Sequence, residues 1–110
     1  MGRFETILVD IDDRGVATIT LNRPEKKNAL SGQMISELTI VASDIPKNEE
    51  IRVAVLRGAG DTFCAGGDLA WMRQQISADR QERIHEARKL ANMLRSLNEM
   101  PIPLLGAIHG

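Results

Sequence analysis

Residues 62–72, TFCAGGDLAWM, carry most of the information about the fold of this chain. They follow an apolar run at residues 51–56, IRVAVL, which is typical of a strand buried on both faces. They also lead into a sequence that resembles the start of a helix. In open α/β folds, ligands bind at the carboxyl ends of such strands. The small residues 65–67 leave the backbone uncovered, so a ligand can approach its amide groups closely.

The two glycines in this stretch, Gly66 and Gly67, also suggest a chemical role. Successive glycines at a helix N-terminus present N–H groups where the helix dipole favours negative charge. Such donors can stabilise an oxyanion, and one of them contributes about 3–4 kcal/mol to a transition state. Taken alone, however, glycines before an aspartate are more commonly a turn followed by a helix N-cap.

The flanking sequence predicts the order β-β-α-β-α-β, with a loop and a short helix before the second long helix. Residues 4–11 and 16–21 are two β-rich runs around a turn, a pattern that predicts a hairpin. Ser31 is expected to cap a helix that Pro46 ends. A second long helix is expected to begin near Ser77 or Asp79, and residues 104–108 form a last short buried strand. The inner stripe expected for the second helix is Ile84, Ala87, Ala91, Leu94 and Leu97.

Composition limits the class of protein. The chain has 110 residues, enough for one domain, with 43% hydrophobic and 26% charged residues and a net charge of −1. This is typical of a soluble globular protein and gives no field that would attract nucleic acid or an anionic membrane. A single cysteine, no signal peptide and no apolar span of about 18 residues favour the cytoplasm.

Three segments resemble the enoyl-CoA hydratase/isomerase (crotonase) family in order and spacing. They are LNRPEKKNAL at residues 21–30, VLRG at 55–58 followed by FCAGGDL at 63–69, and MPIP at 100–103 running to IHG at 108–110. The CAGGDLAWM version is most similar to methylglutaconyl-CoA hydratase-like members. The resemblance implies a crotonase-like (ClpP/crotonase) spiral of ββα units, of which residues 1–110 would form the N-terminal portion of a single domain.

The family resemblance also implies roles for individual residues. The Gly67 N–H would be one of two amides that hold the thioester oxygen, and coenzyme A would enter as part of the substrate, with no permanently bound cofactor. Lys26 and Lys27 could each either contact a phosphate or be a solvated loop lysine. The residues implied to line the coenzyme A site are Lys26, Ala29, Leu30, Ala65, Gly66, Gly67, Asp68 and Leu69.

Several side chains have an ordinary structural interpretation. Asn28 is expected to fix its loop through bonds to the backbone, and Asp68 to cap a short helix in preference to acting as a catalytic acid. Trp71 and Met72 could equally line the acyl pocket or belong to the core. Cys64 is expected to be a small buried hydrophobe. His85 should face solvent and His109 should end a strand, so no metal site is expected.

In the family, the second amide and the catalytic glutamates follow the third segment. We therefore expect either the N-terminal part of a longer enzyme or a short, non-catalytic module that binds coenzyme A or a partner. The implied reaction is hydration of a 2-enoyl-CoA, with isomerisation, dehalogenation and thioester hydrolysis as alternatives on the same scaffold. The expected ligand is an acyl-CoA. The chain is also expected to associate either with further copies of itself, as a trimer or hexamer, or with the C-terminal part of the enzyme.

Overall fold

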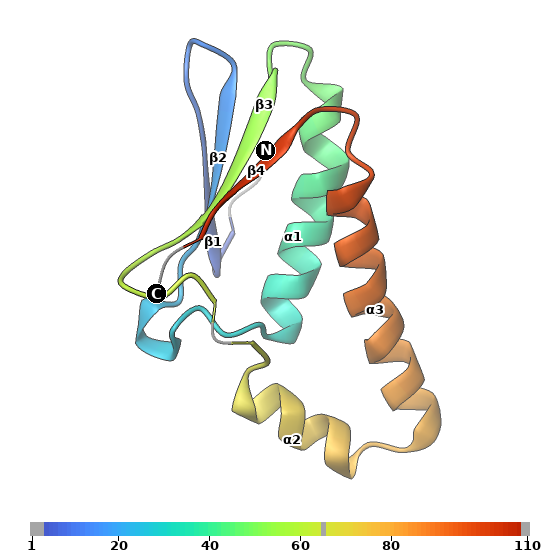
Figure 1. The fold of residues 1–110 in the computed structure, drawn as a ribbon. Coiled ribbons are helices and arrows are strands. Elements are labelled where there is room, and N and C mark those ends of the chain that lie inside the picture. The colour runs from blue at the N-terminus through green and yellow to red at the C-terminus, as the bar shows by residue number, and fades with distance from the viewer. Residues whose placement is uncertain (1–3, 65, 109–110) are drawn as a thin grey trace.

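The computed structural model describes residues 4–64 and 66–108, and within them it has the element order that the sequence predicts (Figure 1). In chain order the strands are β1 (Ile7–Ile11), β2 (Val16–Leu21), β3 (Val53–Gly58) and β4 (Leu104–Ala107). The α-helices are α1 (Gly32–Asp44), α2 (Leu69–Ser77) and α3 (Arg80–Asn98), and two short 3₁₀ helices are η1 (Pro24–Lys26) and η2 (Ile45–Lys47).

The four strands form one mixed sheet in the order β1-β2-β3-β4. β1 and β2 make an antiparallel hairpin, whereas β2 pairs with β3 and β3 with β4 in parallel. Leu21 at the end of β2 lies beside Gly58 at the end of β3. Because the carboxyl ends of parallel strands meet at one edge of a sheet, the loops that follow β2 and β3 start side by side.

The core lies between the sheet and α1, and α3 packs on α1 (Figure 1). Ser31 caps α1 as expected, since its hydroxyl accepts a hydrogen bond from Met34 N at 3.2 Å. Ile19 of the sheet, Met34 and Val41 of α1 and Met93 of α3 are almost fully buried. These buried side chains join the sheet to α1 and α3, and the loops that follow β2 and β3 start from this sheet.

The predicted inner stripe of α3 is wrong except at Leu97. The side chains that pack on the core are Leu90, Met93 and Leu97, whereas Ile84 is 41% and Leu94 56% exposed. Ala87 and Ala91 are exposed as well. The helix carries two apolar stripes, and the spacing of apolar residues does not specify which one meets α1.

The third and fourth strands, whose apolar sequences suit burial on both faces, are covered on only one face by the residues that the structure describes. In β3, Ala54 is buried but Arg57 is exposed, and in β4 Leu105 is 57% exposed. The physical reason is visible in Figure 1, where α1 and α3 lie on the same side of the sheet. The opposite side of the strands has no such cover within the described part of the chain.

A buried carboxylate ties the N-terminal segment to α1. Glu37, only 4% exposed, accepts hydrogen bonds from Glu5 N at 2.9 Å and from Thr6 N and Oγ1 at 2.8 and 2.6 Å. Gln33 Nε2 donates to it at 2.7 Å. Burial alone would raise the pKa of Glu37, but these hydrogen bonds outweigh burial and hold the pKa below its usual value.

Candidate functional site

The loops that follow β2 and β3 are joined by their backbones. Leu30 N donates to Gly66 O, and Asp68 N donates to Leu30 O at 2.7 Å, which makes an isolated parallel bridge between Leu30 and Gly67. Gly58 allows the second loop to fold back, because a Cβ there would stand 2.5 Å from Phe63 O. The two segments that resemble the family motifs therefore meet in space.

The bridge also determines where the Gly67 amide points. In a parallel bridge, the residue whose two neighbours make the bonds turns its own N–H and C=O to the other side. Gly67 N–H is thus directed away from Leu30, and no hydrogen bond within residues 4–64 and 66–108 uses it as donor. Gly67 lies directly before the cap of α2, so its free donor stands at the positive end of a helix dipole.

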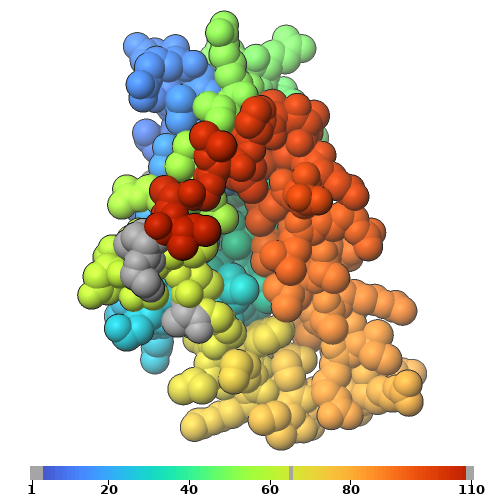
Figure 2. Space-filling model, viewed as in Figure 1, coloured from blue at the N-terminus to red at the C-terminus, as the bar shows by residue number. Residues whose placement is uncertain are grey.

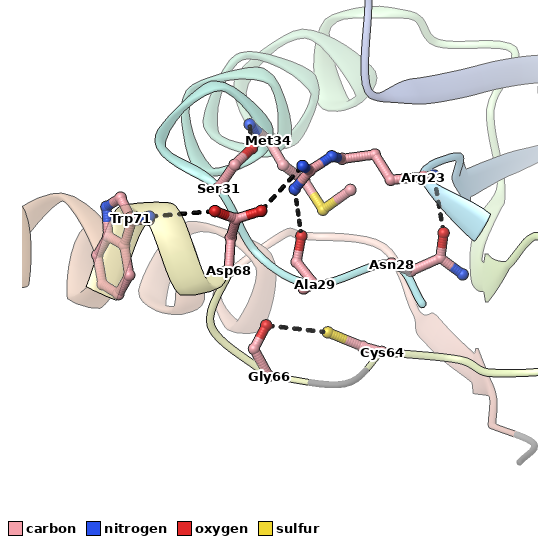
Figure 3. A network of polar contacts seen from close by, with 9 residues as sticks. All are labelled: Arg23, Asn28, Ala29, Ser31, Met34, Cys64, Gly66, Asp68 and Trp71. Atoms are coloured by element: carbon pink, nitrogen blue, oxygen red, sulfur yellow. Dashed lines mark hydrogen bonds and ion pairs between the residues drawn. The ribbon is translucent and has the colours of Figure 1, made fainter. Parts of the chain in front are cut away.

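Asp68 is the N-cap of α2, as predicted from the sequence. Its Oδ1 accepts a hydrogen bond from Trp71 N at 3.1 Å, and its Oδ2 accepts one from Arg23 Nη2 at 2.9 Å (Figure 3). The Trp71 N–H and then the Arg23 guanidinium hold the pKa of Asp68 below its usual value. The carboxylate is therefore ionised near neutral pH with both oxygens engaged, which makes it unsuited to act as a general acid.

Asn28 organises the first loop, as expected. It is fully buried, its Oδ1 accepts a hydrogen bond from Arg23 N at 2.8 Å, and its Nδ2 donates to Ala59 O and Thr62 O at 2.8 and 2.7 Å. Lys27 and Asn28 both have left-handed backbones, with φ of 52° and 56°. Asparagine tolerates this region better than most residues, so Asn28 can both form the turn and tie it to the second loop.

Arg23 is a site residue that the sequence analysis did not single out. Its Nη1 donates to Ala29 O at 2.8 Å while its Nη2 contacts Asp68, so one side chain spans both loops (Figure 3). The available signal was chemical: a capping aspartate in a sheltered position needs a cationic partner. The sequence offers several arginines, and nothing local selects this one.

A cleft of about 690 Å³ opens where the two loops and α2 meet. Figure 2 shows this region, with the loop after β2 in cyan beside the loop after β3 in yellow-green and α2 in yellow. Leu69, which is 67% exposed, and Met72 lie on the α2 side. The lining residues are Arg23, Glu25, Lys26, Lys27, Ala29, Gly67, Asp68, Leu69, Ala70 and Met72.

Five of the residues implied for the coenzyme A site thus line one cleft. Leu30 and Gly66 lie next to it in the bridge, where Gly66 has a φ of +95° that favours glycine. Ala65 lies outside the described residues, as does His109. Cys64 was expected to be buried, but it is only half-buried against the core. His85 is exposed, as expected.

Trp71 and Met72, whose roles the sequence left open, take different positions in the structure. Trp71 packs against the core, and its Nε1 is buried without a partner among the described residues. Met72 is 41% exposed and lies over Gly67, because a Cβ on Gly67 would stand 3.0 Å from Met72 Sδ. Met72 is therefore a wall of the cleft beside the free amide.

No three His, Cys, Asp or Glu side chains lie close enough together to hold a metal ion in the described ranges. None of the helices placed by the structure is long and apolar enough to cross a membrane.

Comparison with known proteins gives a consistent result. The family model of enoyl-CoA hydratase/isomerase matches residues 12–110. An enoyl-CoA hydratase from Shewanella pealeana superposes with a TM-score of 0.94 at 31% identity, over 98% of this chain and 40% of that protein. An enoyl-CoA hydratase of Mycobacterium smegmatis superposes with a TM-score of 0.89 at 34% identity, over 96% and 40%.

A sequence relative carries the name of a different reaction. The trans-2-decenoyl-[acyl-carrier-protein] isomerase of Streptococcus mutans is 30% identical over 108 residues, which are 97% of this chain and 41% of that protein. The chain therefore spans about two-fifths of the length of the proteins it matches.

Proposed function

Since this chain belongs to the enoyl-CoA hydratase/isomerase family and has the fold of the N-terminal portion of a crotonase, we propose that it binds acyl-CoA thioesters and stabilises the thioester oxyanion at Gly67. The observation that carries this proposal is the Gly67 N–H on the wall of the cleft, which donates to no other residue that the structure describes. A fixed donor is suited to a charge that develops on an oxygen, because it needs no reorganisation during the reaction.

The coenzyme A part of the ligand would occupy the rest of the cleft. Lys26 and Lys27 are exposed at its rim, where their ammonium groups can reach phosphate as mobile point charges. Ala29 and the exposed side chain of Leu69 offer an apolar surface for the adenine and pantetheine, and Leu30 lies beside them in the bridge. No permanently bound cofactor is needed for this role.

We propose hydration of a 2-enoyl-CoA as the reaction to which this site contributes. Polarising the thioester carbonyl at Gly67 N–H draws electrons toward the oxygen, which favours addition of water at the far end of the conjugated double bond. Of the carboxylates that line the cleft, Asp68 is engaged by donors and Glu25 is exposed. The proton transfers are therefore assigned to none of the described residues.

Isomerisation is the second candidate, because the Streptococcus mutans relative bears the name of an isomerase. Shifting a double bond also passes through a thioester enolate, so the Gly67 amide would serve that reaction equally. Turnover of crotonyl-CoA, seen as loss of the conjugated enoyl absorbance, would support hydration. Methylglutaconyl-CoA should be tested in parallel, and a chain of the relatives' full length should be assayed beside this one. Binding by both chains with turnover by neither would favour a non-catalytic acyl-CoA-binding module.

Titration calorimetry with acetoacetyl-CoA and with free coenzyme A tests the binding proposal directly. Gly67→Pro removes the N–H donor and is expected to weaken acetoacetyl-CoA binding about tenfold, since a hydrogen bond to a charged group contributes about 1.5–3 kcal/mol. Gly67→Ala is the matched control, because it keeps the N–H and displaces only the flexible end of Met72. Equal affinities of the two variants would show that the oxyanion assignment is wrong.

A further inference from the structure

We propose that Arg23 is a positioning residue of the acyl-CoA site, acting on the Gly67 amide through Asp68. The inference rests on the proposed function for its ligand, but the contacts that carry it belong to the chain alone. It assigns a role to a residue that touches neither the thioester nor the coenzyme A phosphates in the binding mode proposed above.

The guanidinium of Arg23 makes its contacts with both loops at once. Nη2 lies 2.9 Å from Asp68 Oδ2, and Nη1 lies 2.8 Å from Ala29 O. The two charged side chains are largely sheltered, with exposures of 17% for Arg23 and 10% for Asp68. The Arg14–Asp12 pair, in contrast, has exposures of 79% and 30% and lies in the turn between β1 and β2.

The first consequence is geometric. Asp68 has two links to the first loop. Its backbone N–H donates to Leu30 O, and its carboxylate accepts from Arg23, whose guanidinium also donates to Ala29 O. Gly67 is the residue directly before Asp68. The bridge sets the direction of the Gly67 N–H, and Arg23 supports the bridge by holding the capping carboxylate against the first loop.

The second consequence is electrostatic. The ionised carboxylate of Asp68 is adjacent in sequence to the amide that would face an oxyanion, and two negative charges at such short range repel each other. Arg23 is in direct contact with that carboxylate and offsets its charge. Because its charge is already paired, Arg23 is not available for a phosphate, which leaves that contact to Lys26 and Lys27.

These two consequences predict a selective defect. Arg23→Gln is expected to lower the ratio of acetoacetyl-CoA affinity to free coenzyme A affinity about tenfold, because it removes one partner of a sheltered charge pair. Free coenzyme A, which lacks the thioester oxygen, should bind within about twofold of the native chain. Arg14→Gln removes an arginine from the exposed pair and should leave both affinities unchanged.

Two further variants separate the contributions of charge and geometry. Asp68→Asn keeps a good N-cap but removes the charge, so Arg23→Gln should lower the ratio less in that background than in the native chain. Arg23→Lys keeps a charge but cannot bond to Ala29 and Asp68 as a planar fork, so a loss of about threefold is expected. Arg23→Lys also supplies the result if the glutamine variant does not fold.

A measurement without ligand keeps this inference distinguishable from the proposed function. In ¹H–¹⁵N spectra, the amide signals of Gly67 and Asp68 should move in Arg23→Gln and stay in place in Arg14→Gln. If the native chain binds neither ligand, the proposed function fails, and these spectra alone decide the role of Arg23. Unmoved Gly67 and Asp68 signals, or an equal loss of affinity for both ligands, would overturn the inference.

Discussion

Replacing Asn28 by alanine is expected to lower the free energy of unfolding by about 4 kcal/mol, which would be a large part of the stability of a small domain. The side chain is fully buried and makes three hydrogen bonds, to Arg23 N, Ala59 O and Thr62 O. Alanine leaves all three backbone groups without their partner.

The magnitude follows from two contributions. Each hydrogen bond contributes about 1 kcal/mol net, which gives about 3 kcal/mol for the three. The backbone φ of Asn28 is 56°, and alanine in this left-handed region costs about 1 kcal/mol more. Glycine at the same position loses the hydrogen bonds but not the favourable backbone, so Asn28→Gly should be more stable than Asn28→Ala. This order is the reverse of the usual one in regular structure.

Urea unfolding, followed by the fluorescence of the single tryptophan, Trp71, measures these differences. Asn48→Ala is the control, because Asn48 is exposed and its side chain makes one local hydrogen bond, from Glu50 N. It should cost less than about 1 kcal/mol. The reasoning would be refuted if Asn28→Ala were as mild as Asn48→Ala, or if alanine at position 28 were more stable than glycine.

Three other expectations concern the core, the buried carboxylate and the outer face of α3. Met34→Ala should cost about 2–5 kcal/mol in urea unfolding because Met34 is fully buried; Ile40→Ala, at a side chain that is 49% exposed, should cost much less. The folded pKa of Glu37 is lowered, so its contribution to stability is present above the unfolded value, near 4.5, and is lost as the pH falls toward the folded value. Glu37→Gln should therefore destabilise the chain at neutral pH and flatten the acid limb of a stability-against-pH curve; an unchanged acid limb would contradict this assignment. The exposed side chains of Ile84 and Leu94 should make the chain self-associate, so light scattering should give a mass above 12.1 kDa that falls when both are changed to glutamate. A monodisperse 12.1 kDa monomer of the unchanged chain would count against this last expectation.

Features that depend on near neighbours in the chain could be predicted from the sequence. Ser31 and Asp68 were expected at helix starts, and Asp79 was one of two residues expected to begin α3. Each of the three accepts a hydrogen bond from a backbone N–H three residues later. The hairpin of β1 and β2 is local in the same sense. Such features need only a few adjacent residues, so the rest of the fold has little influence on them.

The face of α3 that packs on the core could not be predicted from the spacing of its apolar residues. Its stripe with Ile84 and Leu94 and its stripe with Met93 and Leu97 both have helical spacing, and only the second meets α1. Which stripe is buried depends on where the helix lies relative to α1 and the sheet. That placement is decided by packing across the whole molecule.

Residues 62–72 combine features that the local sequence predicts with features that depend on tertiary packing. The sequence by itself predicted that Asp68 caps α2. Its family motifs also identified residues 63–69 as a coenzyme A loop with Gly67 as a backbone donor. Only the tertiary structure decided that Gly67 N–H points away from Leu30 and that Arg23, 45 residues from Asp68, neutralises its carboxylate. The physical reason is that caps and turns are short-range interactions, whereas a sheltered ion pair depends on which distant segments the sheet brings together.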